Sequence, residues 1–208
     1  MSVYQTEEEQ VEAIKRWWKE NGTSVIAGLV IGLGGVFGWQ AWGNYQDRVG
    51  GEASVAFNQM VGAVQRGDKE SAAKQAELLR ENFDSSSYAL FAALTEARLK
   101  LESGDRAAAK SQLEWAAQQG DDPALTQLAQ LNLARILLDE GDLDAAEKLV
   151  DAKDGGFTGE FAVLQGDIAL AKGDRIAAAA AYTQAMTQEV SNRALLQMKL
   201  DDLAVAAP

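Results

Sequence analysis

The sequence predicts an all-α protein in which a single N-terminal transmembrane helix is followed by a solenoid of paired helices. Three observations predict this fold class: one uncharged apolar stretch of membrane-spanning length, a Gly-Asp pair that recurs along the rest of the chain, and a composition with only 2 prolines in 208 residues. Scarce proline and abundant alanine favour helices over strands.

The apolar stretch runs from Val25 to Trp42, within an interval between Glu20 and Asp47 that has no charged residue. A helix of that length rises about 27 Å, which is close to the thickness of the hydrocarbon core of a bilayer. We therefore expect residues 23–46 to form the transmembrane helix.

Two other interpretations of this stretch stay open. It could be a buried core helix, although each of its glycines would then cost about 1 kcal/mol of helix propensity in water. It could also be a cleaved signal peptide. Against that, about twenty mostly polar residues precede it, and Ala41-Trp42-Gly43 is a poor cleavage site.

The residues beside the apolar stretch predict its orientation. Lys15, Arg16 and Lys19 lie just before it, whereas Arg48 is the only basic residue close behind it. Basic residues are enriched on the cytoplasmic side of membrane helices. The N-terminus is therefore expected in the cytoplasm.

Residues 1–22 are expected to form a cytoplasmic amphipathic segment. Val11, Ile14 and Trp18 recur at helical spacing, and charged residues fill the other faces. The pair Asn21-Gly22 predicts either a helix end or a local break before the transmembrane helix. The segment is typical of an interfacial anchor, and a docking helix for a membrane partner is the alternative.

Small residues in the transmembrane helix predict a contact with another helix. Glycines four residues apart, as at Gly28 and Gly32 and at Gly34 and Gly38, allow two helix backbones to approach closely. The expected contact face could pack against a larger membrane protein or against a second copy in a homodimer. Its residues are Gly28, Gly32, Gly35 and Gly38.

Residues 47–208 are expected to form the large domain on the far side of the membrane. Of the 31 acidic and 19 basic residues, 5 and 3 precede the transmembrane helix, which leaves a net charge of −10 for this domain. Such a charge argues against nucleic-acid binding. The chain has no cysteine and no histidine, which excludes thiol and imidazole catalysis and the usual zinc sites. We expect no enzyme activity and no cofactor or metal.

The recurring Gly-Asp pair predicts the domain's architecture. It occurs at intervals of 37, 37 and 32 residues, each time with an alanine five positions after the glycine. A period of this size in a helical sequence indicates stacked helical hairpins. The four pairs are Gly67-Asp68, Gly104-Asp105, Gly141-Asp142 and Gly173-Asp174, and the alanines are Ala72, Ala109, Ala146 and Ala178.

Each pair is expected to end one helix and begin the next, because glycine tolerates the left-handed conformation and aspartate caps a helix N-terminus. Seven residues before each glycine, a small residue lets the two helices approach. The residues there are Ala97, Ala134 and Gly166, and the first repeat departs from the pattern with Met60.

Further caps mark the remaining helices. Ser85 to Ser87 should begin the helix of residues 88–103, and Asp122-Pro123 should begin the one that ends near Glu140. Gly155-Gly156 should close the helix after Gly141. Ser191 should begin a last helix that covers the open end of the solenoid.

The first helices of successive hairpins are expected to line a partner-binding groove. Arg98 and Arg135 stand at the same repeat position and could pair with carboxylates of a bound segment, or with neighbouring acids of the chain itself. The expected groove residues are Phe91, Leu94, Arg98, Glu102, Leu128, Leu131, Arg135 and Asp139.

These repeats resemble the tetratricopeptide repeat, which has a small residue, then glycine and an acidic residue at the turn, then alanine. Ala134, Gly141, Asp142 and Ala146 match best. The usual proline at the end of the unit is missing throughout. The resemblance implies a tetratricopeptide-like α-solenoid with irregular end repeats.

The whole chain resembles the YfgM family of ancillary subunits of the bacterial SecYEG translocon. The run from Glu9 to Trp18 carries this resemblance most specifically, together with Asn21-Gly22 and the glycine-rich span that closes with Gly38-Trp39. The resemblance implies a single-pass inner-membrane protein with a periplasmic domain. Its implied partners are the translocon, a PpiD-type membrane-anchored periplasmic chaperone and emerging secretory polypeptides.

Two functions stay open. In the first, the chain is a non-enzymatic, chaperone-like adaptor that works beside the translocon through its groove. In the second, it is a self-associating inner-membrane scaffold or a regulator of envelope stress signalling, to which the family has been linked.

Overall fold

A computed structural model of the chain describes residues 7–119, 122–151 and 155–205, and every regular element in these ranges is a helix. Residues 1–6 of the expected cytoplasmic segment lie outside this description. The helices are α1 (Glu7–Gln65), α2 (Lys69–Asn82), α3 (Ser87–Glu102), α4 (Arg106–Gln118), α5 (Pro123–Glu140), α6 (Leu143–Val150), α7 (Thr158–Ala171), α8 (Arg175–Met186) and α9 (Arg193–Val205).

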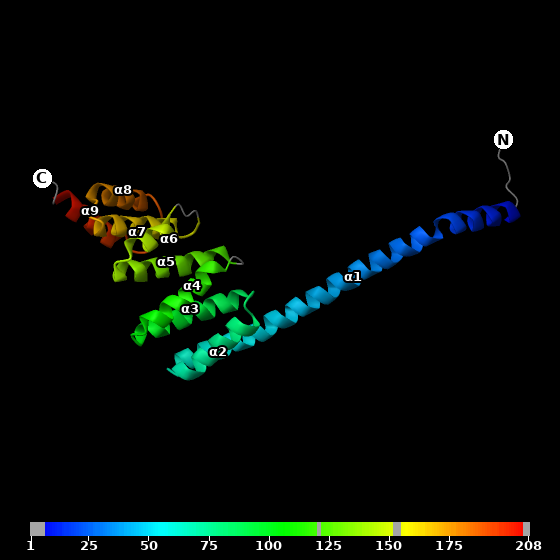
Figure 1. The fold of residues 1–208 in the computed structure, drawn as a ribbon, viewed down its shortest axis with the longest axis horizontal. Coiled ribbons are helices and arrows are strands. Elements are labelled where there is room, and N and C mark those ends of the chain that lie inside the picture. Colours follow the sequence, from blue (N-terminus) through cyan, green and yellow to red (C-terminus); the bar gives the residue numbers. More distant parts are fainter. Residues whose placement is uncertain (1–6, 120–121, 152–154, 206–208) are drawn as a thin grey trace. The chain divides into compact units, whose positions relative to one another are not determined.

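The chain divides into two compact units, Met1–Gly51 and Glu52–Pro208. Helix α1 contributes to both: its residues up to Gly51 belong to the first unit, and those from Glu52 to Gln65 belong to the second. Figure 1 traces both units by colour along the sequence.

The helix of the first unit has no break at Asn21-Gly22, where the sequence predicted a helix end or a break. Instead of capping an end, the Asn21 side-chain amide donates to the Trp17 carbonyl oxygen at 3.0 Å. The Trp18 indole lies over Gly22, where an added Cβ would come within 3.2 Å of the ring. Both contacts reach back one turn, so they hold the helix together at this point.

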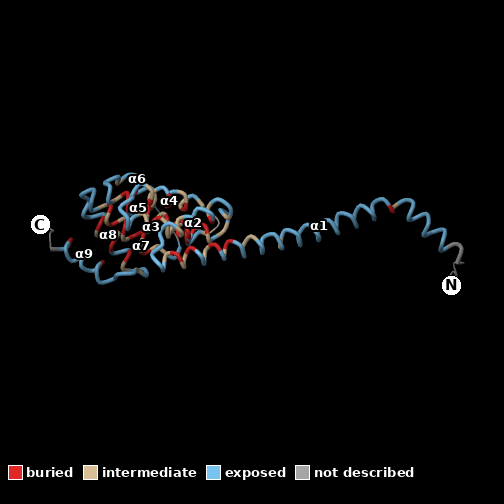
Figure 2. Tube along the Cα trace, turned by 90° about the horizontal axis from the view of Figure 1, so that it is seen from below, coloured by how far each residue is buried: buried red, intermediate tan, exposed pale blue. Residues whose placement is uncertain are grey.

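The apolar stretch of the first unit is exposed. The described part of α1 contains an eighteen-residue window that is long and apolar enough to cross a membrane, and 6% of this window is buried. Figure 2 shows the same stretch in the colour of exposed residues. Within the described residues of the first unit, nothing packs over this stretch.

Each Gly-Asp pair of the second unit forms the same turn. The four glycines have φ between 73° and 84°, which is the left-handed region. The aspartate N–H donates to the carbonyl oxygen five residues earlier at 2.9 Å in every turn. Each aspartate side chain then accepts a hydrogen bond from the backbone N–H three residues later, at 2.9 to 3.2 Å. The predicted turns are confirmed.

The helices of each hairpin pack through pairs of matched volume. The residue seven positions before the turn glycine and the residue nine positions after it are both buried in every repeat. Where one of the two is large, the other is small. The pairs are Met60 with Ala76, Ala97 with Leu113, Ala134 with Val150, and Gly166 with Tyr182. Met60 thus departs from the repeat pattern because its partner position is an alanine.

The second unit is a stack of these hairpins, and Figure 1 shows α2 to α9 following one another through it. Its buried residues form three clusters in succession. The first joins the end of α1 to α2 and α3, the second runs from α3 to α7, and the third joins α7, α8 and α9. Helix α3 contacts α5, and α5 contacts α7, so α3, α5 and α7 form one continuous layer.

Most of the predicted helix boundaries of the second unit are confirmed, and two are wrong. Ser86 caps α3, and Asp122 caps α5 directly before Pro123. Helix α6 ends at Val150, well before Gly155-Gly156. Helix α9 is capped by Asn192, whose side chain accepts a hydrogen bond from the Leu195 N–H at 3.0 Å, and not by Ser191.

The volume pairing predicts the effect of a single methyl group. In Gly166→Ala the new Cβ would overlap the Tyr182 ring, so the substitution should lower the free energy of unfolding by about 1–3 kcal/mol. Adding Tyr182→Leu, which recreates the Ala97 and Leu113 pair of an earlier repeat, should restore part of that loss. Urea unfolding of the full chain in detergent, followed by circular dichroism, measures both. Strictly additive effects of the two substitutions would contradict the pairing.

Candidate functional site

The structure places the predicted groove residues on α3 and α5 but does not bring all of them to an open surface. Arg98, Glu102, Arg135 and Asp139 are exposed. Leu131 is only 1% exposed and belongs to the core, so its assignment to the groove is wrong. The repeat spacing gives the helix face, but the packing of α5 between two neighbours decides how much of that face is open.

Four of the predicted residues line one cleft of about 530 Å³ between α3 and α5, which we call the α3–α5 cleft. They are Leu94, Arg98, Arg135 and Asp139. Apolar side chains from both helices complete it, among them Leu101 and Ile136.

Phe91 lies in an aromatic cluster and not in the lining of this cleft. Its ring centroid is 5.9 Å from that of Phe57, which in turn lies 5.3 Å from that of Tyr88. Phe91 remains 43% exposed, so the cluster offers an aromatic surface at the α1 and α3 end of the layer.

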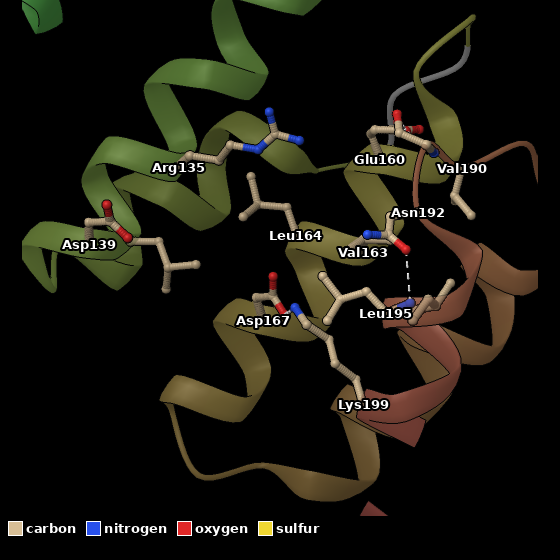
Figure 3. A pocket seen from close by; sticks show the side chains of 13 residues that line it. Arg135, Asp139, Glu160, Val163, Leu164, Asp167, Val190, Asn192, Leu195 and Lys199 are labelled. Atoms are coloured by element: carbon tan, nitrogen blue, oxygen red, sulfur yellow. Dashed lines mark hydrogen bonds and ion pairs between the residues drawn. The ribbon is translucent and has the colours of Figure 1, made fainter. Parts of the chain in front are cut away.

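A second cleft of about 420 Å³ lies between α5, α7 and α9, and we call it the α5–α9 cleft. It shares Arg135 and Asp139 with the first. Figure 3 shows Arg135 reaching from α5 across the side of Leu164, with Glu160 and Lys199 on the farther walls.

The sequence prediction missed this second cleft, although the repeat itself carried the signal. The last turn follows after 32 residues instead of 37. Counted back from Gly173, the residues Glu160, Val163 and Asp167 stand where Phe91, Leu94 and Arg98 stand relative to Gly104. Extending the groove by this rule would have found α7. The walls from α9 could not be found in this way, because α9 belongs to no repeat.

Most charged groups of the two clefts are paired within the chain. Arg98 Nε lies 2.9 Å from Glu102 Oε1, and Arg106 Nη2 lies 3.5 Å from Asp139 Oδ2. Lys199 pairs with Asp167. For Arg98 the internal pairing with a neighbouring acid is therefore the correct alternative.

Arg135 differs from these cations. Its guanidinium donates to the side-chain oxygen of Asn132 at 3.2 Å. Among the residues that the structure describes, no carboxylate lies within ion-pair distance of it.

The wall of the α5–α9 cleft is held by hydrogen bonds to two acids of α7. Glu160 Oε1 accepts from the backbone N–H of Ser191 at 2.7 Å and from its hydroxyl at 2.5 Å, which fixes the segment before α9. The Tyr182 hydroxyl donates to Asp167 Oδ1 at 2.5 Å, and Lys199 also donates to that oxygen. Burial and the neighbouring Asp167 carboxylate raise the pKa of Tyr182.

The four glycines of the predicted membrane contact are open. A Cβ added at Gly28, Gly32, Gly35 or Gly38 would meet nothing within 4 Å. Nothing in the first unit therefore occupies this face.

The arrangement suits binding. No group of three or more carboxylates that could hold a metal ion occurs in the part of the chain that the structure describes. What the clefts offer a ligand is apolar side chains, hydrogen-bonding groups and the guanidinium of Arg135.

Comparison with known proteins extends over nearly the whole chain. A family model described as a tetratricopeptide repeat-like domain matches residues 15–205. A protein of Haemophilus influenzae named ancillary SecYEG translocon subunit is 34% identical over 97% of this chain and 100% of its own length. A protein of the same name from Aggregatibacter actinomycetemcomitans is 34% identical over 95% of this chain and 97% of its own length. Another, from Escherichia coli strain K12, is 30% identical over 99% of this chain and 100% of its own length.

The Tyr182 hydrogen bond predicts how stability depends on pH. Because the folded-state pKa of Tyr182 is raised above its ordinary value near 10, the protonated hydroxyl stabilises the fold below about pH 10, and this stabilisation is lost as the pH rises further. In unfolding measurements on the full chain in detergent between pH 8 and 11, Tyr182→Phe should lose less stability than the wild type. At pH 8 the variant should be about 1 kcal/mol less stable, because the hydrogen bond is gone.

The control is Tyr88→Phe, which leaves the contact between Tyr182 and Asp167 intact and should keep the wild-type loss. An equal alkaline loss in the wild type and in Tyr182→Phe would show that this hydrogen bond does not govern the pH dependence.

Proposed function

Because the chain belongs to the family of ancillary SecYEG translocon subunits with a tetratricopeptide repeat-like domain, we propose that it is a non-enzymatic adaptor at the translocon of the inner membrane. In this proposal the apolar helix of the first unit anchors the chain as a single pass. The second unit lies in the periplasm and binds polypeptide segments along its clefts.

The observation that carries this proposal is that the match runs end to end. It covers 97% of this chain and all of the Haemophilus influenzae protein, so the apolar helix and the repeats belong to one shared architecture. A domain held beside a channel meets emerging segments at a high effective concentration, so weak contacts suffice. This fits clefts that offer apolar walls and few unpaired charges.

The proposed partners are SecYEG itself, a PpiD-type membrane-anchored periplasmic chaperone and secretory polypeptides. The net charge of −10 for residues 47–208 keeps the domain away from anionic lipid headgroups, and this favours an orientation that leaves the clefts accessible.

A second function is favoured by the open glycine face. Helices with glycines four residues apart also form symmetric dimers. In that case the chain would be a self-associating scaffold or a regulator of envelope stress signalling, and Gly32 and Gly35 would face the same residues of a second copy.

The proposed topology predicts a labelling pattern. Because the chain has no cysteine, a single introduced thiol is labelled unambiguously. In cells with a permeabilised outer membrane and an intact inner membrane, Gln118→Cys should react with a membrane-impermeant maleimide. Gln10→Cys should react only after the inner membrane is lysed. The reverse pattern would contradict a periplasmic second unit.

The proposed membrane contact predicts which products a cross-linker forms. A photoreactive amino acid at Gly32 or Gly35 in native membranes should yield adducts with a translocon subunit, identified by mass spectrometry. Phe37 is the matched control, because it lies about half a turn round the helix from Gly35 and should give far less product. A homodimer as the main product from both glycines would favour the scaffold and overturn the adaptor's membrane contact.

A further inference from the structure

The cations of the two clefts differ in what they are free to bind. Arg98, Arg106 and Lys199 each have a carboxylate partner within the second unit. Arg135 donates to the neutral side chain of Asn132, and no described carboxylate lies within ion-pair distance of it. A carboxylate that enters the clefts can therefore pair with Arg135 without displacing an internal acid.

Arg135 is also accessible from both clefts. It is exposed on α5, and it lines the α3–α5 cleft on one side and the α5–α9 cleft on the other. Figure 3 shows its side chain extended beside the apolar floor at Leu164. A guanidinium beside an apolar surface pairs with a carboxylate more strongly than one in open water, because less water screens the pair.

The apolar part of the site lies next to Arg135. Leu94 and Leu101 on α3 line the same cleft as Arg135 on α5. Packed helices have axes about 8–10 Å apart, and an extended chain rises about 3.3 Å per residue. An extended segment whose carboxylate pairs with Arg135 therefore places a residue about two or three positions away beside Leu94.

The charges around Arg135 limit the ligand to few negative groups. Asp139, Glu160 and Asp167 line the α5–α9 cleft, and the domain as a whole is strongly acidic. A run of acidic residues would be repelled, whereas one carboxylate among uncharged residues pairs with Arg135 at little cost.

We infer that Arg135 is the specificity-determining residue of the groove, which selects extended polypeptide segments that carry one carboxylate two or three residues from an apolar side chain. This inference rests on the proposed function, because it assumes that the clefts bind polypeptides.

Paired peptides test the inference. The probe is an array of thirteen-residue segments of a secretory protein, each made twice, once unchanged and once with Asp and Glu replaced by Asn and Gln. The full chain in lipid nanodiscs is applied to the array. The pair that binds best is then measured in solution by fluorescence anisotropy at low and high salt.

The wild type should bind the acidic member of the pair about fivefold more tightly than the amide member, and salt should reduce this preference. Arg135→Gln should remove the preference and leave the affinity for the amide member unchanged. Arg135→Lys should retain part of the preference. Lys148→Gln removes the same charge from an exposed position on α6, away from the clefts, and should retain all of the preference.

Three other results would overturn the inference. Equal binding of both members by the wild type, or a preference that survives Arg135→Gln, would overturn the role of Arg135 and leave peptide binding by the clefts in place. If neither member of any pair bound the wild type, the binding function of the clefts would fail together with this inference. The cross-linking from Gly32 and Gly35 would still decide the translocon contact by itself.

Discussion

The turn between the two helices of each hairpin is the constraint on which the rest of the second unit depends. A glycine in the left-handed region ends one helix, and the following aspartate caps the next through the N–H three residues on. Such a cap contributes about 1 kcal/mol, and glycine avoids the steric cost that a Cβ would bring at that φ. Because the four turns share one geometry, the positions before and after them face each other in the same register.

That register explains the volume pairing in the core. The buried residues seven before and nine after the turn glycine share one space, so a larger residue on one side requires a smaller one on the other. Tyr182 fills this space in the last hairpin and leaves room only for Gly166, whereas Met60 fills it from the other side against Ala76. The large Tyr182 also reaches Asp167 with its hydroxyl, which ties the core of the last hairpin to the wall of the α5–α9 cleft.

The same register produces the clefts. The residues six positions before the turn glycine, Arg98 on α3, Arg135 on α5 and Asp167 on α7, all line a cleft on one layer of contacting helices. The repeats differ in whether the charged residue at this position forms an ion pair within the chain. Arg98 has Glu102 one turn away on its own helix, whereas Arg135 has only Asn132. A difference between neighbouring repeats thus turns an ordinary surface arginine into a candidate binding group.

The sequence by itself determined the helical class, the apolar helix, the four Gly-Asp turns with their caps, and the helix faces of the groove, because each depends on residues close together in the chain. Only the tertiary structure decided that Leu131 is buried, that Met60 fits against Ala76, and that α9 closes a second cleft with Lys199 paired to Asp167. These features depend on contacts between residues far apart in the sequence. Their outcome is set by the volume and charge of both partners together, which no local pattern records.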